Sequence, residues 1–267
     1  IEHVKRYTTT GMGTDQGKLG NMHALGIISD TADAKMGELG TTTFRPPYTP
    51  LTFGTIVGRN VGEYFDAFRK TPIHDWHLKN KAQFENVGQW KRAWYYPKDN
   101  EDMHQAVQRE SKAARDSAGI LDASTLGKID IQGTDASEFL NRVYTNAWSK
   151  LAIGKCRYGL MLNEDGMVYD DGVTTRLAKN HYIMTTTTGG AANVMSKLED
   201  YLQTEWPELD VYLTSVTDHF ATVSVCGPNS KKIISNVIPD LDLSDDNFPH
   251  MSFKDAKIDK INCRIMR

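Results

Sequence analysis

The sequence predicts an α+β protein whose sheets are mainly antiparallel. Three observations lead to this prediction. Strand-like and helix-like patterns mix along the chain without regular alternation, and many strand-like runs are short and close together. Two of these runs flank Asn-Glu-Asp-Gly at 163–166, a sequence with the chemistry of a tight hairpin turn.

The first 60 residues differ from the rest. A Gly- and Thr-rich stretch, TTTGMGTDQGKLGN at 8–21, precedes a helical pattern over 21–37. The following TTTFRPPYTPLTFG at 41–54 cannot form a helix interior and predicts an extended linker. The Gly-rich stretch lacks the spacing of the standard nucleotide-binding fingerprints. We therefore interpret residues 1–60 as a connector and residues 61–267 as the main domain.

The clearest helix is predicted over 99–118. Asp99 or Asn100 can cap its start, and Gly119 ends it. Its apolar stripe is made of Met103, Val107, Ala114 and Ala118.

The remaining elements follow from shorter patterns. Strands are expected over 120–132, 155–162, 167–176, 181–188, 211–217, 220–227, 251–256 and 258–266. Helices are expected over 134–144, 190–204 and 228–237.

Composition limits the function classes. Of the 267 residues, 39% are hydrophobic and 24% are charged, and the net charge is -3. This balance does not favour nucleic acid or an anionic membrane surface as partners. No apolar run has the length of a membrane span or the form of a signal peptide. Three widely spaced cysteines argue against a disulfide framework and fit a reducing compartment, so a soluble cytoplasmic protein is expected.

Both ends of the chain suggest a piece of a longer polypeptide. The sequence begins with Ile1, and it ends on KIDKINCRIMR, an alternating strand-like run without a turn after it. We therefore expect the main domain to be incomplete at its C-terminus.

Two adjacent aspartates, Asp170 and Asp171, lie inside the strand-like run GMVYDDGVTTR at 166–176. Strands disfavour aspartate, and neighbouring side chains in a strand point to opposite faces. The pair could simply end the strand at a bend. Alternatively, one carboxylate lies in a cleft, where it can bind an amine or move a proton. The pattern alone leaves both interpretations open.

An ordered series of segments resembles the folate-binding aminomethyltransferase family, which includes the glycine cleavage T-proteins. The segments are TPIHDWH at 71–77, VGQWKRAWYYP at 87–97, GILDAS at 119–124, VYTN at 143–146 and NEDGMVYDD at 163–171. The resemblance covers about 71–267 and implies the T-protein-like fold. In addition, KRYTTTGMGTDQGKLGN and GTTTFRPPYTP are similar to the segment that precedes this domain in the α subunits of heterotetrameric sarcosine oxidases.

The resemblance implies roles for five residues. Asp171 would lie against the reactive nitrogens of a reduced folate, as the catalytic carboxylate, whereas Asp170 would be structural. Tyr158 would contact the folate, and Leu126 would make an apolar contact to its ring. Thr185 and Thr187, expected on one face of a strand, would line the pterin, although T-proteins commonly have Asn at the position of Thr187. Ordinary strand, turn or core roles are the alternatives for all five.

The implied function is capture, on tetrahydrofolate, of the imine or formaldehyde equivalent that oxidative demethylation of sarcosine releases, giving 5,10-methylenetetrahydrofolate. FMN, FAD and NAD would belong to the full complex but not to this chain. The implied partners are the flavin-carrying β subunit and the small γ and δ subunits. Two alternatives stay open: a non-catalytic scaffold or docking fragment, and an aminomethyltransferase that serves another N-methyl amine oxidase or the glycine cleavage system.

A metal site is not expected. His74 and His77 are three residues apart and could share a helix face, but no third ligand accompanies them in the sequence. His77 is interpreted as a packing or hydrogen-bonding residue.

Overall fold

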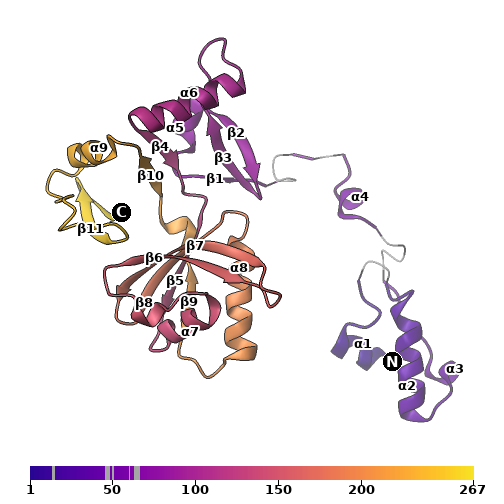
Figure 1. The fold of residues 1–267 in the computed structure, drawn as a ribbon. Helices are drawn as coiled ribbons and strands as arrows, with labels where there is room; N and C mark the ends of the chain where they lie inside the picture. Colours follow the sequence, from indigo (N-terminus) through magenta and orange to yellow (C-terminus); the bar gives the residue numbers. More distant parts are fainter. Residues whose placement is uncertain (14–15, 46–48, 50, 60, 63–66) are drawn as a thin grey trace. The chain divides into compact units, whose positions relative to one another are not determined.

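The computed structural model describes residues 1–13, 16–45, 49, 51–59, 61–62 and 67–267, and divides into two compact units, Ile1–Ala67 and Phe68–Arg267 (Figure 1). Each unit is described by itself.

The first unit is helical. It contains α1 (Glu2–Thr8), α2 (Gly20–Ala32), α3 (Met36–Leu39) and α4 (Phe53–Val57). The helix predicted over 21–37 is too long, because α2 ends where Asp33 takes a left-handed conformation with φ 49°. The predicted linker is wrong at its end, where Thr52 caps α4 by accepting a hydrogen bond from the Thr55 N–H. Residues 46–48 and 50 of that linker lie outside the described residues.

The Gly-rich stretch surrounds a buried asparagine. Gly11 and Gly17 have positive φ angles of 78° and 81°. A Cβ at Gly11 would lie 2.7 Å from Asn21 Oδ1, and one at Gly17 would lie 2.6 Å from the same atom. Asn21 in turn donates a hydrogen bond to Thr42 Oγ1, at 2.9 Å. Glycine is needed at these two positions because any side chain would collide with Asn21.

The second unit is built around a five-stranded sheet with strand order β6-β7-β8-β5-β9. Its strands are β5 (Gly127–Gln132), β6 (Cys156–Leu162), β7 (Val168–Ala178), β8 (His181–Thr186) and β9 (Tyr212–Ser215), and all neighbours are antiparallel. The predicted fold class is confirmed. The predicted β6–β7 hairpin is also present, since the N–H of Asn163 donates to the Met167 carbonyl across the turn.

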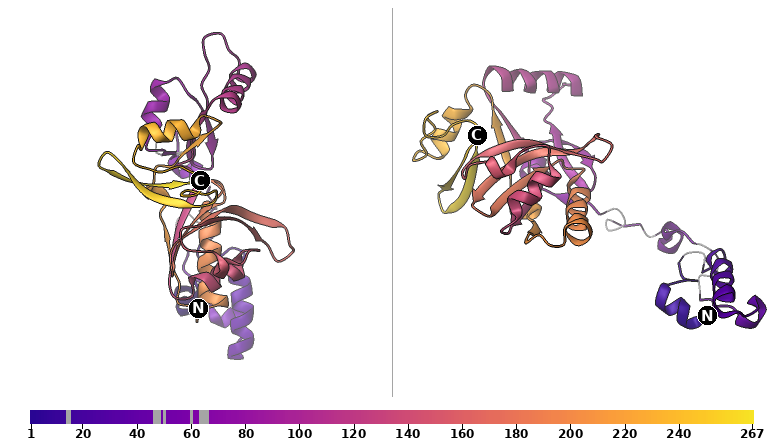
Figure 2. Two further views of the ribbon diagram at one scale, coloured as in Figure 1. Left: turned by 60° about the vertical axis from the view of Figure 1, so that its left-hand side comes forward. Right: turned by 60° about the horizontal axis from the view of Figure 1, so that its bottom comes forward.

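Two helices, α7 (Ala136–Val143) and α8 (Ala191–Asp200), cover one face of this sheet (Figures 1 and 2). The core lies between them and the sheet, because apolar side chains alternate along the strands and recur on one side of each helix. Its fully buried members include Ile129, Ile131, Phe139, Leu140, Met161, Tyr182, Met184, Val194 and Leu198.

Smaller sheets complete the unit. β1 (Arg69–Lys70), β2 (Gln83–Val87) and β3 (Trp90–Tyr95) form a three-stranded sheet beside α5 (His74–Lys79), with β1 parallel to β3. β4 (Gly119–Asp122) pairs with β10 (Val223–Cys226), and β11 (Phe253–Ile258) pairs with β12 (Ile261–Met266). Two further helices are α6 (Met103–Asp116) and α9 (Ser230–Val237).

Several predicted boundaries within this unit differ from the structure, among them those of the strands predicted over 220–227, 251–256 and 258–266, which are β10, β11 and β12. The strand predicted over 120–132 is two strands, β4 and β5, in different sheets, separated by a turn in which the Leu126 N–H donates to the Ala123 carbonyl. The strand predicted over 181–188 ends at Thr186. The helix predicted over 190–204 is present as α8 followed directly by a π-helical segment, Tyr201–Glu205, so its extent holds and only its last turn differs in type.

The predicted helix over 99–118 is α6, but its cap and its buried face differ from the prediction. Asp102 is the cap, and its side chain accepts from the Gln105 N–H while the Gln105 side chain accepts from the Asp102 N–H. This reciprocal capping box satisfies two backbone donors, an advantage that Asp99 and Asn100 lack. Ala106 is the fully buried position of α6, whereas Val107 is 41% exposed.

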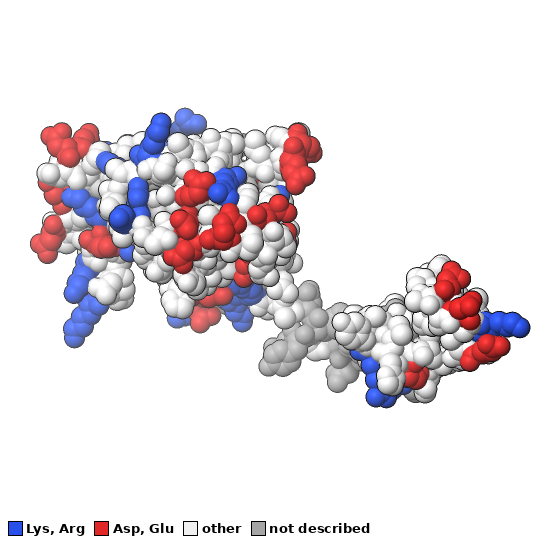
Figure 3. All heavy atoms as spheres, turned by 90° about the horizontal axis from the view of Figure 1, so that it is seen from below, with Lys and Arg blue, Asp and Glu red and all other residues white. Residues whose placement is uncertain are grey.

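Among the residues that the structure describes, no helix is long and apolar enough to cross a membrane. Acidic and basic side chains lie interspersed on the face of the larger unit that Figure 3 shows.

Candidate functional site

Strand β7 sends its two aspartates to opposite faces of the five-stranded sheet. Asp170 lies opposite Met161, a core residue, and Asp171 lies opposite Leu160. Asp170 is accordingly only 4% exposed, and Asp171 is half-buried on the other face. The two carboxylates therefore lie in different environments, one on the core face of the sheet and one on the opposite face.

Asp170 fixes the turn between β8 and α8. Its Oδ1 accepts a hydrogen bond from the Thr187 hydroxyl at 2.6 Å, and its carboxylate also faces the Thr187 N–H at 3.3 Å. Burial raises the pKa of this carboxyl group, although the bonds from Thr187 oppose the increase. These contacts agree with the structural role expected for Asp170.

Asp171 is joined to Tyr158 of the neighbouring strand. The Tyr158 hydroxyl donates to Asp171 Oδ2 at 2.7 Å, and the Tyr158 side chain is 50% exposed. The hydrogen bond to Asp171 and the negative charge beside it raise the pKa of Tyr158. The structure thus brings together two of the predicted site residues on an accessible part of the sheet.

Thr185 lies on the same face but has its hydroxyl engaged. It follows Met184, a core residue, and so points away from the core. Its Oγ1 accepts from the Val173 N–H at 2.9 Å and donates to the Val173 carbonyl at 3.2 Å. Val173 lies directly opposite Tyr158. Thr185 therefore supports the strand beside Tyr158 and Asp171 through its hydroxyl.

Thr187 is not on the face that the sequence predicted. It lies beyond the end of β8, and its hydroxyl donates to Asp170 on the core side of the sheet. The prediction that Thr185 and Thr187 share one strand face is wrong, because the Asp170 carboxylate holds the chain in a turn at this point.

Leu126 lies in the turn between β4 and β5. Its carbonyl accepts a hydrogen bond from Lys128 Nζ at 2.9 Å, and the Thr125 hydroxyl of the same turn lies 3.0 Å from that of Thr188. Lys128 lies opposite Thr185 in the β5–β8 pairing and is only 3% exposed. Burial lowers the pKa of its ammonium group. Lys128 is not among the residues predicted from the sequence, where its only signal is a lysine inside the strand-like run LGKIDI at 126–131.

A buried polar network lies behind this turn. His77 Nε2 is 2.8 Å from Asp122 Oδ2, and its Nδ1 is 2.5 Å from the Tyr96 hydroxyl. Burial alone would raise the pKa of Asp122, but the hydrogen bonds from Ser124 and His77 hold it below its usual value. His77 is therefore a hydrogen-bonding residue of the interior. The described part of the chain contains no group of three or more side chains arranged to hold a metal ion.

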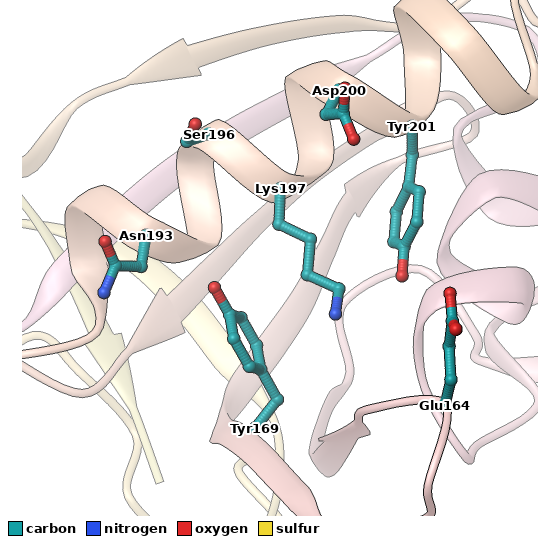
Figure 4. Close-up of a pocket in the computed structure, with 7 residues that line it drawn as sticks. All are labelled: Glu164, Tyr169, Asn193, Ser196, Lys197, Asp200 and Tyr201. Atoms are coloured by element: carbon teal, nitrogen blue, oxygen red, sulfur yellow. The ribbon is translucent and has the colours of Figure 1, made fainter. Parts of the chain in front are cut away.

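A surface groove of about 470 Å³ lies on α8 and the β6–β7 hairpin (Figure 4). It is lined by Glu164, Tyr169, Asn193, Ser196, Lys197, Asp200 and Tyr201. Lys197 Nζ lies 4.3 Å from the centre of the Tyr169 ring and donates to Asn163 Oδ1. None of the five predicted site residues lines this groove, so the Tyr158–Asp171 pair lies on a separate part of the unit.

Family models match nearly the whole chain. Residues 73–267 match the GCVT N-terminal domain, and residues 1–59 match the sarcosine oxidase A3 domain. The chain therefore belongs to the GCVT N-terminal domain family.

The chain is also similar, over nearly its whole length, to individual proteins. The sarcosine oxidase subunit alpha of Corynebacterium sp. (strain P-1) is 55% identical over 100% of this chain, and that of Rhizobium meliloti (strain 1021) is 49% identical over 97%. The chain spans 28% and 26% of those two subunits.

A solved structure supports the fold. The glycine cleavage system aminomethyltransferase T from Bartonella henselae matches with a TM-score of 0.60 and 22% identity, covering 72% of this chain and 48% of that one.

Proposed function

We propose that this chain is the folate-binding part of a sarcosine oxidase α subunit. On this proposal, tetrahydrofolate binds at the Tyr158–Asp171 face of the five-stranded sheet. The GCVT N-terminal domain match and the 55% identity to a sarcosine oxidase subunit alpha support the assignment. The A3 domain match over residues 1–59 favours this setting over a free-standing aminomethyltransferase.

The observation that carries the proposal is the 2.7 Å hydrogen bond from Tyr158 to Asp171 on an accessible strand pair. A reduced folate presents amine N–H groups that a carboxylate can bind. The bond from Tyr158 fixes the rotation of the Asp171 carboxylate and leaves its other oxygen to accept from an amine. A short side chain on a paired strand also loses little conformational freedom when a ligand binds.

The proposed chemistry depends on the negative charge of the Asp171 carboxylate. On this proposal, the flavin of a partner subunit would supply the two-electron oxidation of sarcosine. Tetrahydrofolate, held beside Asp171 and Tyr158, would supply the nitrogens that take up the resulting one-carbon unit and release glycine. The products are 5,10-methylenetetrahydrofolate and glycine. Asp171 stabilises the positive charge that passes onto the folate nitrogens and accepts or returns a proton there.

The remaining predicted contacts belong to the same proposal. Leu126 would meet the pterin ring from the β4–β5 turn, while Thr185 would act mainly by holding β7 beside β8. The partner subunits, β, γ and δ, and a cytoplasmic location are inferred from the likeness to sarcosine oxidase α subunits.

The test is a calorimetric titration of this chain with tetrahydrofolate under anaerobic conditions, alongside Asp171→Asn. Saturable binding that the variant weakens supports the folate site. Absence of binding by both proteins would leave the fold unchanged and would favour the alternative, in which this chain acts as a scaffold for other parts of the enzyme.

A further inference from the structure

The ammonium group of Lys128 is a buried charge in the larger unit. Its side chain is 3% exposed, and it makes no ion pair among the described residues. Removing a cation from water is costly unless hydrogen bonds replace the lost hydration. A lysine at this position therefore requires a compensating set of acceptors.

Three backbone carbonyls provide that compensation. Lys128 Nζ donates to Leu126 O at 2.9 Å, to Ser124 O at 3.0 Å and to Thr217 O at 3.4 Å. An ammonium group has three N–H donors, so each donor has one acceptor. Two of these carbonyls belong to the β4–β5 turn, and the third belongs to η3 (Thr217–His219), the short helix after β9.

Lys128 also connects this turn to the Tyr158–Asp171 face. It is opposite Thr185 on β8, Thr185 is bonded to Val173 on β7, and Val173 is opposite Tyr158 on β6. Residues directly opposite each other point to the same face of a sheet. Lys128, Thr185, Val173 and Tyr158 therefore form one row across four strands. At one end of the row Tyr158 is accessible, and at the other end Lys128 is covered by the turn that it holds.

We propose that Lys128 is a positioning residue for folate binding, which fixes the Ser124–Leu126 turn so that Leu126 is presented to the pterin ring. This inference rests on the proposed function. Without the ammonium group, the Ser124, Leu126 and Thr217 carbonyls lose this donor together, and the turn loses its side-chain link to η3. The remaining bonds of the turn, such as Ser124 N–H to Asp122 and Thr125 to Thr188, hold its other side.

The charges around Lys128 come from three elements packed against it. Asp122 of β4 and Asp218 of η3 favour the ammonium form, whereas Arg69 of β1 opposes it. Arg69 is itself paired with Asp218 at 2.7 Å. A methionine at position 128 retains the length and apolar stem of lysine while removing the donors, and so tests the hydrogen bonds specifically.

The experiment uses the full chain with four changes: Lys128→Met, Leu126→Ala, the double variant, and Lys179→Met as a control at an exposed lysine. The affinity for tetrahydrofolate is measured by calorimetry, and backbone hydrogen exchange is followed by mass spectrometry. Lys128→Met is expected to weaken binding about tenfold and to speed exchange in residues 123–127, whereas Lys179→Met changes neither.

The double variant separates positioning from a general loss of stability. If Lys128 acts through Leu126, the double variant binds no more weakly than Leu126→Ala alone, because the two changes remove the same contact. Additive losses, or an unchanged affinity and unchanged exchange in Lys128→Met, would overturn the inference. Failure of the unaltered chain to bind folate contradicts the proposed function instead, and the exchange of the turn then still tests the role of Lys128 in holding it.

A measurement on the unaltered chain covers the case in which Lys128→Met does not fold. Acetylation of native lysines, followed by peptide mass spectrometry, should modify Lys128 at least a hundredfold more slowly than Lys179, because its amine is buried and fully bonded. Equal rates at the two lysines would show that the turn opens freely and would contradict the inference.

Discussion

The Tyr158 hydroxyl and the Asp171 carboxylate meet at 2.7 Å across two antiparallel strands, although 13 positions separate them in the sequence. Tyr158 is not directly opposite Asp171, which pairs with Leu160. The long tyrosine side chain instead reaches diagonally along the strand to its neighbour two positions away. This diagonal contact places a donor against the one carboxylate of the pair that faces away from the core.

The first prediction concerns the affinity for folate. On the proposed function, Asp171→Asn removes the negative charge that would accept a hydrogen bond from a folate amine. Because hydrogen bonds to charged groups contribute roughly 1.5–3 kcal/mol, the dissociation constant for tetrahydrofolate should rise about 10- to 100-fold. Calorimetry measures this directly.

Asp259→Asn is the matched control for that prediction. Asp259 lies in the β11–β12 turn with φ 53°, a conformation that asparagine also adopts readily. The affinity of the Asp259→Asn variant for tetrahydrofolate should equal that of the unaltered chain. An equal loss in both variants would contradict a specific role for Asp171.

The second prediction concerns the ionisation of Tyr158. Its pKa is raised above the ordinary 10.0 because the protonated hydroxyl is bonded to Asp171. Stability from this bond is therefore fully present below pH 10.0 and is lost as pH rises through the higher folded-state pKa. In Asp171→Asn the charge is absent, so the pKa of Tyr158 should decrease.

Ultraviolet titration at alkaline pH follows this change, and Tyr158→Phe identifies the signal. The absorbance step that disappears in Tyr158→Phe should move to lower pH in Asp171→Asn. A step that stays in place would show that the hydrogen bond does not form in solution.

The third prediction compares the two adjacent aspartates. Asp170→Ala leaves the Thr187 hydroxyl and N–H without their buried acceptor and should lower the free energy of unfolding by about 1–3 kcal/mol. Asp171→Ala, on the accessible face, should change it by less than about 0.5 kcal/mol. Urea unfolding monitored by circular dichroism measures both. Equal losses would contradict the assignment of the two side chains to opposite faces.

The fourth prediction tests the buried network behind the β4–β5 turn. His77→Gln cannot retain both the Tyr96 and the Asp122 contacts in the same geometry, and it should lower the free energy of unfolding by on the order of 2–3 kcal/mol. His104→Gln, on the exposed side of α6, is the control and should have little effect. Similar unfolding curves for both variants would show that the network contributes little.

The same network gives a pH dependence with a definite sign. The pKa of Asp122 is held below its usual value in the folded chain. Its contribution to stability is therefore present above the unfolded-state pKa of 3.8 and is lost as pH falls through the lower folded-state value. Asp122→Asn should flatten this acid limb of the urea-unfolding midpoint plotted against pH, and an unchanged acid limb would contradict the assignment.

Much of the fold followed from local patterns. The hairpin at 163–166 was readable because its turn sequence lies between two strand-like runs. The predictions fail where contacts with residues distant in the sequence, and not the local pattern, determine the conformation of the chain. Thr187 continues a run of strand-forming threonines, but Asp170, from another strand, bends the chain there. The strand predicted over 120–132 looked continuous because sequence periodicity does not reveal that β4 and β5 pair with different partners.

The sequence by itself determined the fold class, the hairpin and the choice of Asp171 and Tyr158 as candidates, because turn chemistry, strand alternation and an ordered series of motifs are all local properties. Only the tertiary structure decided which aspartate faces the core, why Thr187 leaves the sheet and how a buried Lys128 is compensated. These outcomes depend on hydrogen bonds between residues distant in the chain, such as the bond from Lys128 to Thr217 across 89 positions, and no local pattern records them.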